Sequence, residues 1–308
     1  KSKINIYPCA SLTKNIEGTN MTEFGLLQKK GIIAFTDGVQ TIQNPRLMSR
    51  IMNSAKDLGC LIMQHAEDYE LAKNGMINSG IIATKLGLSG IPEIAERILI
   101  ERDLTLLEKA KCRYHISQLS SQKSLEVIRF RKEMVKFTSG VSINNLSLNE
   151  NDIGDFRTFL KLSPPLRSED DRIALVQGLK DELIDVIVSD HKPEDEESKR
   201  LTFSQAATGA SGIETLLSLS LELYHNGSLK LETIIKALTS NPAKILKINK
   251  GNLSIGNDAD LCIVDIDKPW IVKKEKLISK SKNTSIEDKK LQGKVINTFV
   301  KGKELFNL

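Results

Sequence analysis

The fold is decided by one short stretch, Asp185-Val186-Ile187-Val188-Ser189-Asp190-His191-Lys192-Pro193. It starts with a dense β-branched apolar run, which is typical of a strand buried on both faces of a parallel sheet. It ends in an acid and a histidine, and Pro193 then prevents the strand from continuing. In barrels of parallel strands the chemistry lies where the strands end. Asp190 therefore stands where a catalytic carboxylate is expected, although a polar loop cap is the commoner explanation of an isolated Asp-His pair.

Strand-like and helix-like segments alternate before this stretch and after it. We expect strands at 4–7, 31–38, 60–65, 113–118, 135–141 and 183–189, and helices at 21–30, 45–58, 91–110, 124–133, 171–181, 212–227 and 231–246. Repeated strand-then-helix units imply parallel strands joined by right-handed crossovers. A doubly wound sheet fits part of this pattern. A (β/α)8 barrel of the TIM type fits better, because polar residues follow nearly every strand and no Gly-rich nucleotide loop is found.

Fewer than eight strands are visible, and the chain starts at Lys1 without Met, directly before an expected strand. We therefore expect an α/β barrel that is incomplete at its amino terminus. After about residue 250 the pattern changes to a turn-rich link, a short apolar strand at 261–265 and a hairpin around Gly302. The expected domains are a barrel over residues 1–250 and a small β-rich domain over residues 251–308, with a polar loop at 280–284 inside the latter.

The composition excludes several classes of protein. The net charge is +5, but the lysines are scattered among 39 acids and aromatics make up only 5%, so no nucleic-acid surface is indicated. No apolar run is long enough to span a membrane. The four cysteines are scattered through the chain, which favours buried thiols in a reducing compartment over disulfides. We expect a cytoplasmic protein that binds a small molecule.

Histidines and acids collect at the expected strand ends. Asp37, His65 and Asp190 each follow a strand, and His115 lies near the end of another. Imidazole nitrogen and carboxylate oxygen at converging strand ends suit zinc. A bound ion would lower the pKa of a water to near 7, and a free carboxylate would move its proton. From spacing alone, metal-assisted hydrolysis and a purely structural role are about equally favoured.

Six motifs occur in an order that is specific to one family. They are the segments at 7–13, 34–38, 64–68, 161–167, 189–193 and 279–284, and residues 256–261 look like a return into a small β domain. With these motifs the chain resembles the dihydroorotases of the amidohydrolase superfamily, of the long-chain type found in bacteria.

The resemblance implies a metal-dependent barrel hydrolase that interconverts N-carbamoyl-L-aspartate and dihydroorotate in pyrimidine biosynthesis. It implies zinc, as one or two ions, with Asp37 as a bridging ligand and His65 as a histidine ligand. Asp190 would be both a metal ligand and the general base. The substrate contacts it implies are Ser163, Glu194, Thr208 and Gly209.

The chain also departs from the family's pattern. The His-x-His pair of the first barrel strand is absent, and Gln118 stands where many members have a ligand histidine. Period-2 alternation places His115 on the opposite face from Gln118, so we expect His115 to pack inside the barrel. Ser163 replaces a substrate-binding asparagine. Glu194 replaces a histidine, and its charge would repel an anionic substrate unless a metal or a basic group offsets it.

Three functions remain open at this point. The first is an active dihydroorotase. The second is a non-catalytic relative that serves as a structural partner of aspartate carbamoyltransferase, which Gln118 and Glu194 favour. The third is an allantoinase or hydantoinase, which Asp37 argues against, because those enzymes usually carry a carbamylated lysine there. A homo-oligomer is also possible. We further expect Arg167 to fix its loop and His225 to help end a helix. Glu67 and Asp68 either hold His65 in one orientation or cap the next helix, and capping is favoured.

Overall fold

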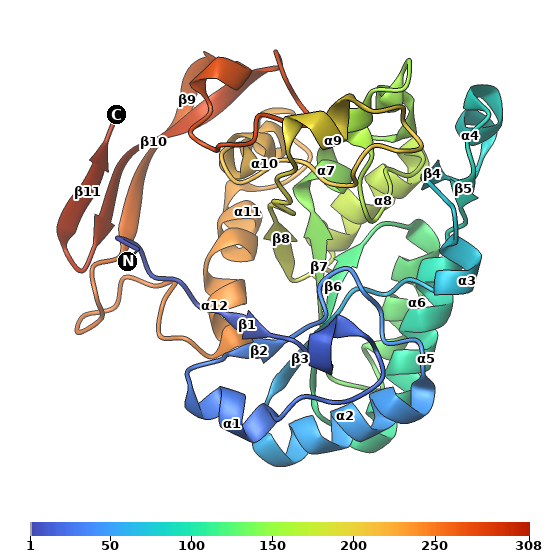
Figure 1. Cartoon of the computed structure of the whole chain (residues 1–308). Helices are drawn as coiled ribbons and strands as arrows, with labels where there is room; N and C mark the ends of the chain where they lie inside the picture. Colours follow the sequence, from blue (N-terminus) through green and yellow to red (C-terminus); the bar gives the residue numbers. More distant parts are fainter. Residues whose placement is uncertain (1) are drawn as a thin grey trace.

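Six parallel strands form the central sheet of the computed structural model, which describes residues 2–308. Their order in the sheet follows the chain: β1 (Cys9–Ala10), β2 (Ala34–Phe35), β3 (Leu61–Gln64), β6 (Arg113–Leu119), β7 (Thr138–Ser142) and β8 (Val186–Val188). Every neighbouring pair is parallel, and helices surround the curved sheet on its outer side (Figure 1). This is the strand order of a TIM-type barrel, so the expected fold class is confirmed. Within residues 2–308, β1 and β8 each pair on one side only.

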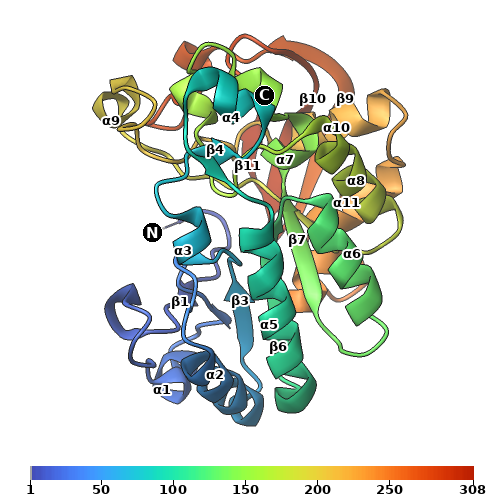
Figure 2. The same cartoon turned by 90° about the vertical axis from the view of Figure 1, so that its right-hand side faces the viewer.

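Helices cover the outer face of the sheet, and neighbours along the chain pack on each other (Figures 1 and 2). They are α1 (Phe24–Lys29), α2 (Pro45–Leu58), α5 (Ile94–Ala110), α6 (Gln122–Arg131), α8 (Glu169–Lys180), α10 (Leu216–His225), α11 (Leu231–Leu238) and α12 (Ser240–Leu246). Their ends carry clear local signals. The side chain of Asn44 caps α2, Pro45 is its first residue, and Gly59 ends it in the left-handed conformation. A single helix expected over 231–246 is instead two helices, which break at Thr239, because Pro242 cannot donate the next helical hydrogen bond.

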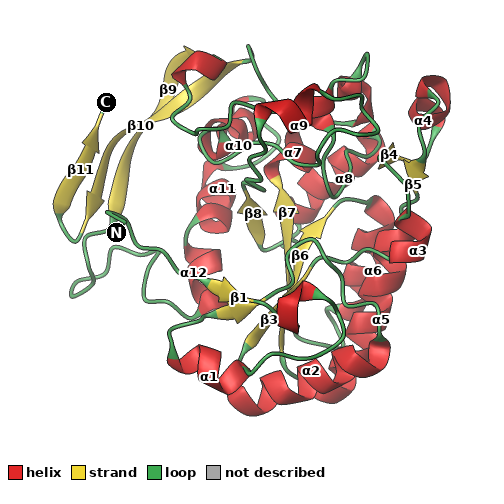
Figure 3. Ribbon diagram, viewed as in Figure 1, coloured by secondary structure: helices red, strands yellow, loops and turns green. Residues whose placement is uncertain are grey.

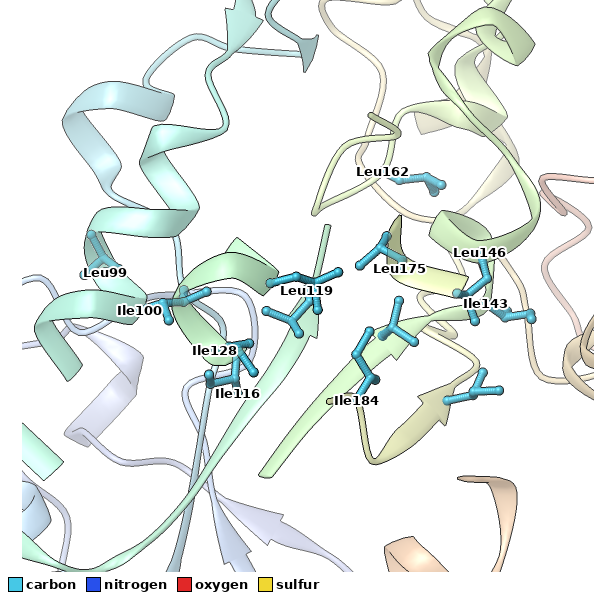
Figure 4. Packing of buried hydrophobic residues seen from close by; sticks show 14 of the residues in the cluster. Leu99, Ile100, Ile116, Leu119, Ile128, Ile143, Leu146, Leu162, Leu175 and Ile184 are labelled. Carbon is cyan, nitrogen blue, oxygen red and sulfur yellow. The ribbon is translucent and has the colours of Figure 1, made fainter. Parts of the chain in front are cut away.

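The core lies between the sheet and these helices. Ile116 and Leu119 of β6 lie beside Ile100 of α5 and Ile128 of α6 (Figure 4), and all four side chains are fully buried. Full burial of one such side chain stabilises the fold by about 1.5–3 kcal/mol. This packing fixes the direction of β6 and therefore the place where its carboxyl end presents polar side chains.

A second, antiparallel sheet lies outside the barrel (Figure 3). It consists of β9 (Leu261–Ile271), β10 (Lys290–Val300) and β11 (Lys303–Asn307). The hairpin turns at Lys301 and Gly302, both with positive φ, as expected around that glycine. The sheet is attached to α10 through Ser218, whose hydroxyl donates to the carbonyl of Gly293 and accepts from the Trp270 indole.

Three parts of the fold differ from the expectation. The segment at 4–7 is not a strand, since the first strand is β1. Residues 66–93 make an excursion that no sequence pattern indicates, with α3 (Tyr69–Ala72), β4 (Ile77–Asn78), α4 (Ile81–Leu86) and β5 (Gly90–Ile91). The loop at 280–284 bonds to loops of the barrel instead of the small sheet, since the backbone N–H of Ser211 donates to the Asn283 carbonyl.

Short elements complete the chain. They are α7 (Ile143–Ser147), α9 (Glu196–Arg200) and the 3-10 turns η1 (Lys14–Ile16), η2 (Glu150–Ile153), η3 (Thr158–Leu160) and η4 (Lys274–Lys276). In residues 2–308, none of the helices has both the length and the apolar character needed to cross a membrane.

Candidate active site

The carboxyl ends of four neighbouring strands bring polar side chains together around Asp190. The Gln118 amide at the end of β6 donates to Asp190 Oδ1 at 2.8 Å, and the hydroxyl of Ser142, the last residue of β7, donates to Oδ2 at 3.3 Å. Burial lowers the pKa of the His65 imidazole, which follows β3, and the Gln118 side chain offsets part of this shift. Parallel strands end at the same edge of a sheet, so this cluster occupies the place where such folds carry their chemistry.

The chain turns sharply at Asp190. Its φ of 48° lies in the left-handed region, which residues other than glycine rarely adopt and which costs about 1–3 kcal/mol unless the surroundings impose it. The surroundings do so here. His191 forms a parallel bridge with Ala210, and its Nδ1 accepts the backbone N–H of Gly212 at 3.2 Å. A side chain at Gly212 would collide with the carbonyl of Ser189, so this close approach requires glycine.

Burial shapes the acidity of the Asp190 carboxyl. It raises the pKa of this group from 3.8 to about 6, and the bond from Ser142, the charge of Lys192 and the bond from Gln118 offset part of the rise. A carboxyl group with a pKa near neutrality can both accept and return a proton under ordinary conditions.

His65 is buried and neutral. Burial lowers the pKa of its imidazole to about 4. Its Nε2 lies 3.3 Å from the hydroxyl of Ser163. Its Nδ1 is buried and has no hydrogen-bond partner among the described residues, which is a costly state for a polar atom. A neutral imidazole with an unpaired nitrogen is suited to bind a cation or a substrate donor.

Asp37 makes different contacts. Its Oδ1 accepts the backbone N–H groups of Leu12 and Thr13 at 2.7 and 3.0 Å, and its Oδ2 accepts the Thr13 hydroxyl. The carboxylate thus fastens the loop after β1 to the end of β2. Across residues 2–308, no group of three His, Cys, Asp or Glu side chains is arranged to hold a metal. The role of Asp37 as a metal ligand stays a prediction.

Two of the other expected substrate contacts, Glu194 and Gly209, bond to one asparagine. Asn283 Oδ1 accepts the backbone N–H of Glu194 at 3.3 Å, and its amide donates to the Gly209 carbonyl at 3.1 Å. The Glu194 carboxylate lies 3.6 Å from Lys192 Nζ, so a basic group does offset its charge. Thr208 is half-buried beside Gly209. The structure thus brings Glu194 and Gly209 together, whereas their contact with a substrate stays a prediction.

A register shift in β6 changes the relation of His115 to Gln118. Between the pairs Ile116–Ser139 and Leu119–Val141, β6 advances by one residue more than β7. Such a bulge resets the alternation of side chains, so His115 and Gln118 come to the same face, and the expectation of opposite faces is wrong. His115 is still not part of the cluster, because it is buried and its Nδ1 bonds to Thr138 Oγ1 at 2.8 Å.

The structural roles expected for three polar residues agree with their contacts. Arg167 is buried and donates to the Ser120 hydroxyl, to Asn78 Oδ1 and to the Ile91 carbonyl, so it ties its own loop to the end of β6 and to the segment at 66–93. Asp68 caps α3 through the N–H of Leu71. His225 is the last residue of α10 and bonds to the carbonyl of Ile266.

Ser142 and Asn283 were not among the site residues predicted from the sequence. Ser142 ends β7 in the same way that Asp190 follows β8, so its position was a usable signal. Asn283 lies in a loop far along the chain from Glu194 and Gly209, and no spacing connects the three residues.

Comparison with known proteins identifies the class. The model of the amidohydrolase family matches residues 19–305. In fold, the chain is similar to an L-hydantoinase (dihydropyrimidinase) from Arthrobacter aurescens, with a TM-score of 0.83 and 25% identity over 96% of this chain and 68% of that one. The chain belongs to the amidohydrolase family.

Two relatives are more similar in sequence. The dihydroorotase of Ehrlichia chaffeensis is 40% identical over 305 residues, which are 98% of this chain and 68% of that protein. The dihydroorotase of Syntrophus aciditrophicus is 40% identical over 304 residues, which are 98% of this chain and 71% of that protein. Within the amidohydrolases the chain thus groups with the dihydroorotases, as the sequence motifs indicated.

Proposed function

We propose that this protein is a dihydroorotase, a hydrolase of a cyclic amide that interconverts dihydroorotate and N-carbamoyl-L-aspartate in pyrimidine biosynthesis. The observation that carries the proposal is the half-buried Asp190 carboxylate at the end of β8, next to Gln118 and Ser142, in a chain 40% identical to dihydroorotases over almost its whole length. The hydantoinase of similar fold is only 25% identical, so the alternative cyclic amidases are not favoured, and neither is a non-catalytic role.

The chemistry follows from the acidity and position of Asp190. In hydrolysis, the oxygen of a water bonds to the ring amide carbon, the carbon–nitrogen bond breaks, and the ring nitrogen gains a proton. The Asp190 carboxylate takes the proton from the water and returns it to the departing nitrogen. Gln118 and Ser142 hold both carboxylate oxygens in place, which fixes the base relative to the water. Ring closure uses the same groups in the reverse order.

The side chains near Asp190 fit zinc only in part. His65 Nδ1 is buried without a partner and Asp190 is an acid in the same cluster, so we propose these two as zinc ligands. Asp37 already accepts three hydrogen bonds from the loop after β1, and Gln118 is a poor zinc ligand next to imidazole. When bound, zinc polarises a carbonyl oxygen and lowers the pKa of a water. The proton transfers above are assigned to Asp190 alone.

The substrate contacts are the next part of the proposal. Ser163 lies against His65, and Glu194 and Gly209 meet at Asn283. The hydroxyl groups of Ser163 and Thr208 offer hydrogen bonds to a cyclic amide that carries a carboxylate, and Lys192 offsets the Glu194 charge. Thr208 belongs to the same segment as Gly209. We propose that these groups orient the ring over Asp190.

A comparison of substrates tests the proposed function. The purified protein, supplied with zinc, is incubated separately with dihydroorotate, hydantoin and dihydrouracil, and ring opening is followed by absorbance. We expect dihydroorotate to be hydrolysed with a kcat/KM at least about 100-fold above the other two rings, since its carboxylate adds charge-assisted contacts. Preference for hydantoin or dihydrouracil would overturn the assignment.

An association with aspartate carbamoyltransferase is a separate part of the proposal. It rests on the resemblance to the dihydroorotases, some of which act as partners of that enzyme. Size-exclusion chromatography of the two purified proteins tests it, and the same experiment on this protein alone tests a homo-oligomer. The cytoplasmic location also stays a prediction.

A further inference from the structure

Two buried lysines surround the segment at 204–209. Lys161 Nζ donates to the carbonyls of Ser204 and Ala206 at 2.9 and 2.8 Å. Lys199 Nζ donates to the carbonyls of Ala207 and Gly209 at 2.7 and 3.0 Å. The side chain of Lys199 is among the largest that are fully buried in the protein. We call these bonds the carbonyl clamp.

The partners of the clamp are unusual for buried charges. In the described part of the chain, neither lysine has a carboxylate oxygen within ion-pair distance, and the nearby acid Glu194 pairs with Lys192 instead. Burying an ammonium group without a counter-charge is expensive. The four carbonyls supply the hydrogen bonds that compensate for it, and the Phe203 ring lies 6.0 Å from Lys161 Nζ. The geometry of the 204–209 backbone and the charge of the lysines therefore depend on each other.

The segment that the clamp holds runs beside His191 and Lys192, which follow Asp190. Gly209 has a φ of 141°, and a side chain there would come within 2.7 Å of the Lys192 carbonyl. Its N–H donates to the Lys161 carbonyl, and Ala210 forms the bridge with His191. Movement of Gly209 would therefore be transmitted to the residues that follow Asp190.

We propose that Lys199 is a positioning residue that fixes Thr208 and Gly209 for substrate binding by holding the carbonyls on either side of Thr208. This inference rests on the proposed function, because it takes Thr208 and Gly209 as substrate contacts. Lys199 does not touch the reacting atoms. Its loss acts on the geometry of binding, and its effect falls on KM more than on kcat.

The acidity of Lys199 gives the clamp a dependence on pH. Burial lowers the pKa of its ammonium from 10.5 to about 8, Glu194 opposes this shift, and Lys161 and Lys192 add to it. Lys199 and Glu194 line a pocket on the protein surface. The other charged residues that line this pocket are Asp195, Glu196, Lys274, Glu275, Lys280 and Lys282. As the pH rises through about 8 the ammonium loses its proton and its bonds to the carbonyls weaken, so KM rises reversibly.

Kinetics of Lys199→Met and Lys199→Arg test the inference. For Lys199→Met we expect KM for dihydroorotate to rise about tenfold or more with kcat within about threefold, since bonds from a charged donor stabilise by that order. The rise of KM above pH 8 should vanish in this variant. Lys199→Arg should restore part of the affinity and also lack the alkaline rise, because a guanidinium stays charged. An unchanged KM in Lys199→Met would overturn the proposal.

A matched control variant shows whether a rise of KM in Lys199→Met comes from general loss of structure. A second measurement tests the clamp even if the proposed substrate is wrong. Lys132 also donates to a backbone carbonyl, that of Glu182, but near the start of β8, so Lys132→Met should leave KM unchanged. Hydrogen exchange of the Ala207 and Gly209 amides needs no substrate, and we expect it to speed up in Lys199→Met alone. If the wild-type protein does not hydrolyse dihydroorotate, the proposed function is wrong. The hydrogen-exchange measurement still tests the carbonyl clamp in that case. Unchanged exchange would refute the clamp itself.

Discussion

At the scale of single residues, Gln118 decides what the strand ends around Asp190 can bind. Its amide donates a neutral hydrogen bond to the Asp190 carboxylate, and its side chain raises the pKa of the His65 imidazole against the larger effect of burial. An imidazole at this position would add a nitrogen donor to the histidine and the acid already present. Three such donors are the usual protein contribution to a zinc site that keeps one position open.

Gln118→His therefore should bind zinc more tightly than the wild type. We expect the affinity to increase about tenfold or more, because a third ligand joins His65 and Asp190. Equilibrium dialysis at neutral pH measures this without any need for turnover. Gln177→His, on the exposed face of α8, is the control for an added surface histidine. Equal zinc affinity in wild type and Gln118→His would contradict the placement of His65 and Asp190 as ligands.

Single residues also show what the sequence could and could not predict of the site. Asp190 and His65 were found because an ionisable side chain after an apolar run is visible in the sequence. The contacts of Asp37 with Leu12 and Thr13 could not be predicted, since they depend on how closely the loop after β1 approaches β2. Whether Asp37 also binds a metal, as the resemblance implies, stays a prediction.

At the scale of elements, local signals set the helices and packing sets their separation. The segment at 45–58 was predicted with the bounds that α2 has, because Asn44, Pro45 and Gly59 mark its ends. The excursion at 66–93 could not be predicted, because its helices and strands are too short to show a helical or strand repeat of apolar residues. The bulge in β6 was also invisible, because an extra residue in one strand matters only relative to its neighbour.

Gly178 in α8 tests this packing directly. A Cβ there would lie 3.1 Å from both Leu125 Cδ2 of α6 and Ile184 Cδ1, which is tighter than ordinary contact. We expect Gly178→Ala to destabilise the protein by about 1–3 kcal/mol through overpacking, even though alanine is the better helix former. Urea unfolding measures the change.

Gly25 in α1 is the matched control. The nearest atom to a Cβ at this position is 3.8 Å away, on Leu58. Gly25→Ala should therefore stabilise the protein by up to about 1 kcal/mol, which is the intrinsic preference of a helix for alanine. If both variants are stabilised to the same degree, the inference that α8 packs too closely on α6 to accept a side chain at Gly178 is wrong.

At the scale of the whole molecule, the six-stranded parallel sheet and the outer antiparallel sheet agree with the expected barrel and small β domain. The boundary near residue 250 stays a prediction. The loop at 279–285 belongs by its contacts to the barrel, since Ser285 bonds to Asn144 and Asn283 to Gly209. The loop at 279–285 therefore brings polar side chains to the candidate site. Its polar composition alone did not predict this position.

Buried histidines make the whole fold sensitive to acid. Burial lowers the pKa of His115 from 6.5 to about 4. Above pH 6.5 the group is neutral in both states and has no effect. Between pH 6.5 and 4 the unfolded chain binds a proton that the folded chain does not, so stability is lost as the pH falls. The loss amounts to about 3 kcal/mol at most for one such group.

Unfolding of wild type and His115→Gln at pH 7 and pH 4.5 checks this expectation. The free energy of unfolding should fall less between these two values in His115→Gln, because a glutamine does not titrate. His225→Gln is the control, since His225 is exposed at the end of α10. An equal loss of stability in wild type and His115→Gln would show that His115 is not held neutral.

The most direct test of the central claim is the kcat of Asp190→Asn for dihydroorotate. The amide keeps the size of the side chain but cannot take a proton from water, so we predict a loss of about 100-fold to 10,000-fold. Asp185→Asn is the control, because Asp185 lies just before β8 and bonds to the Ser139 backbone at the opposite end of that strand. Its kcat should stay within about threefold of the wild type. A kcat for Asp190→Asn equal to that of Asp185→Asn would contradict the assignment of Asp190 as the general base.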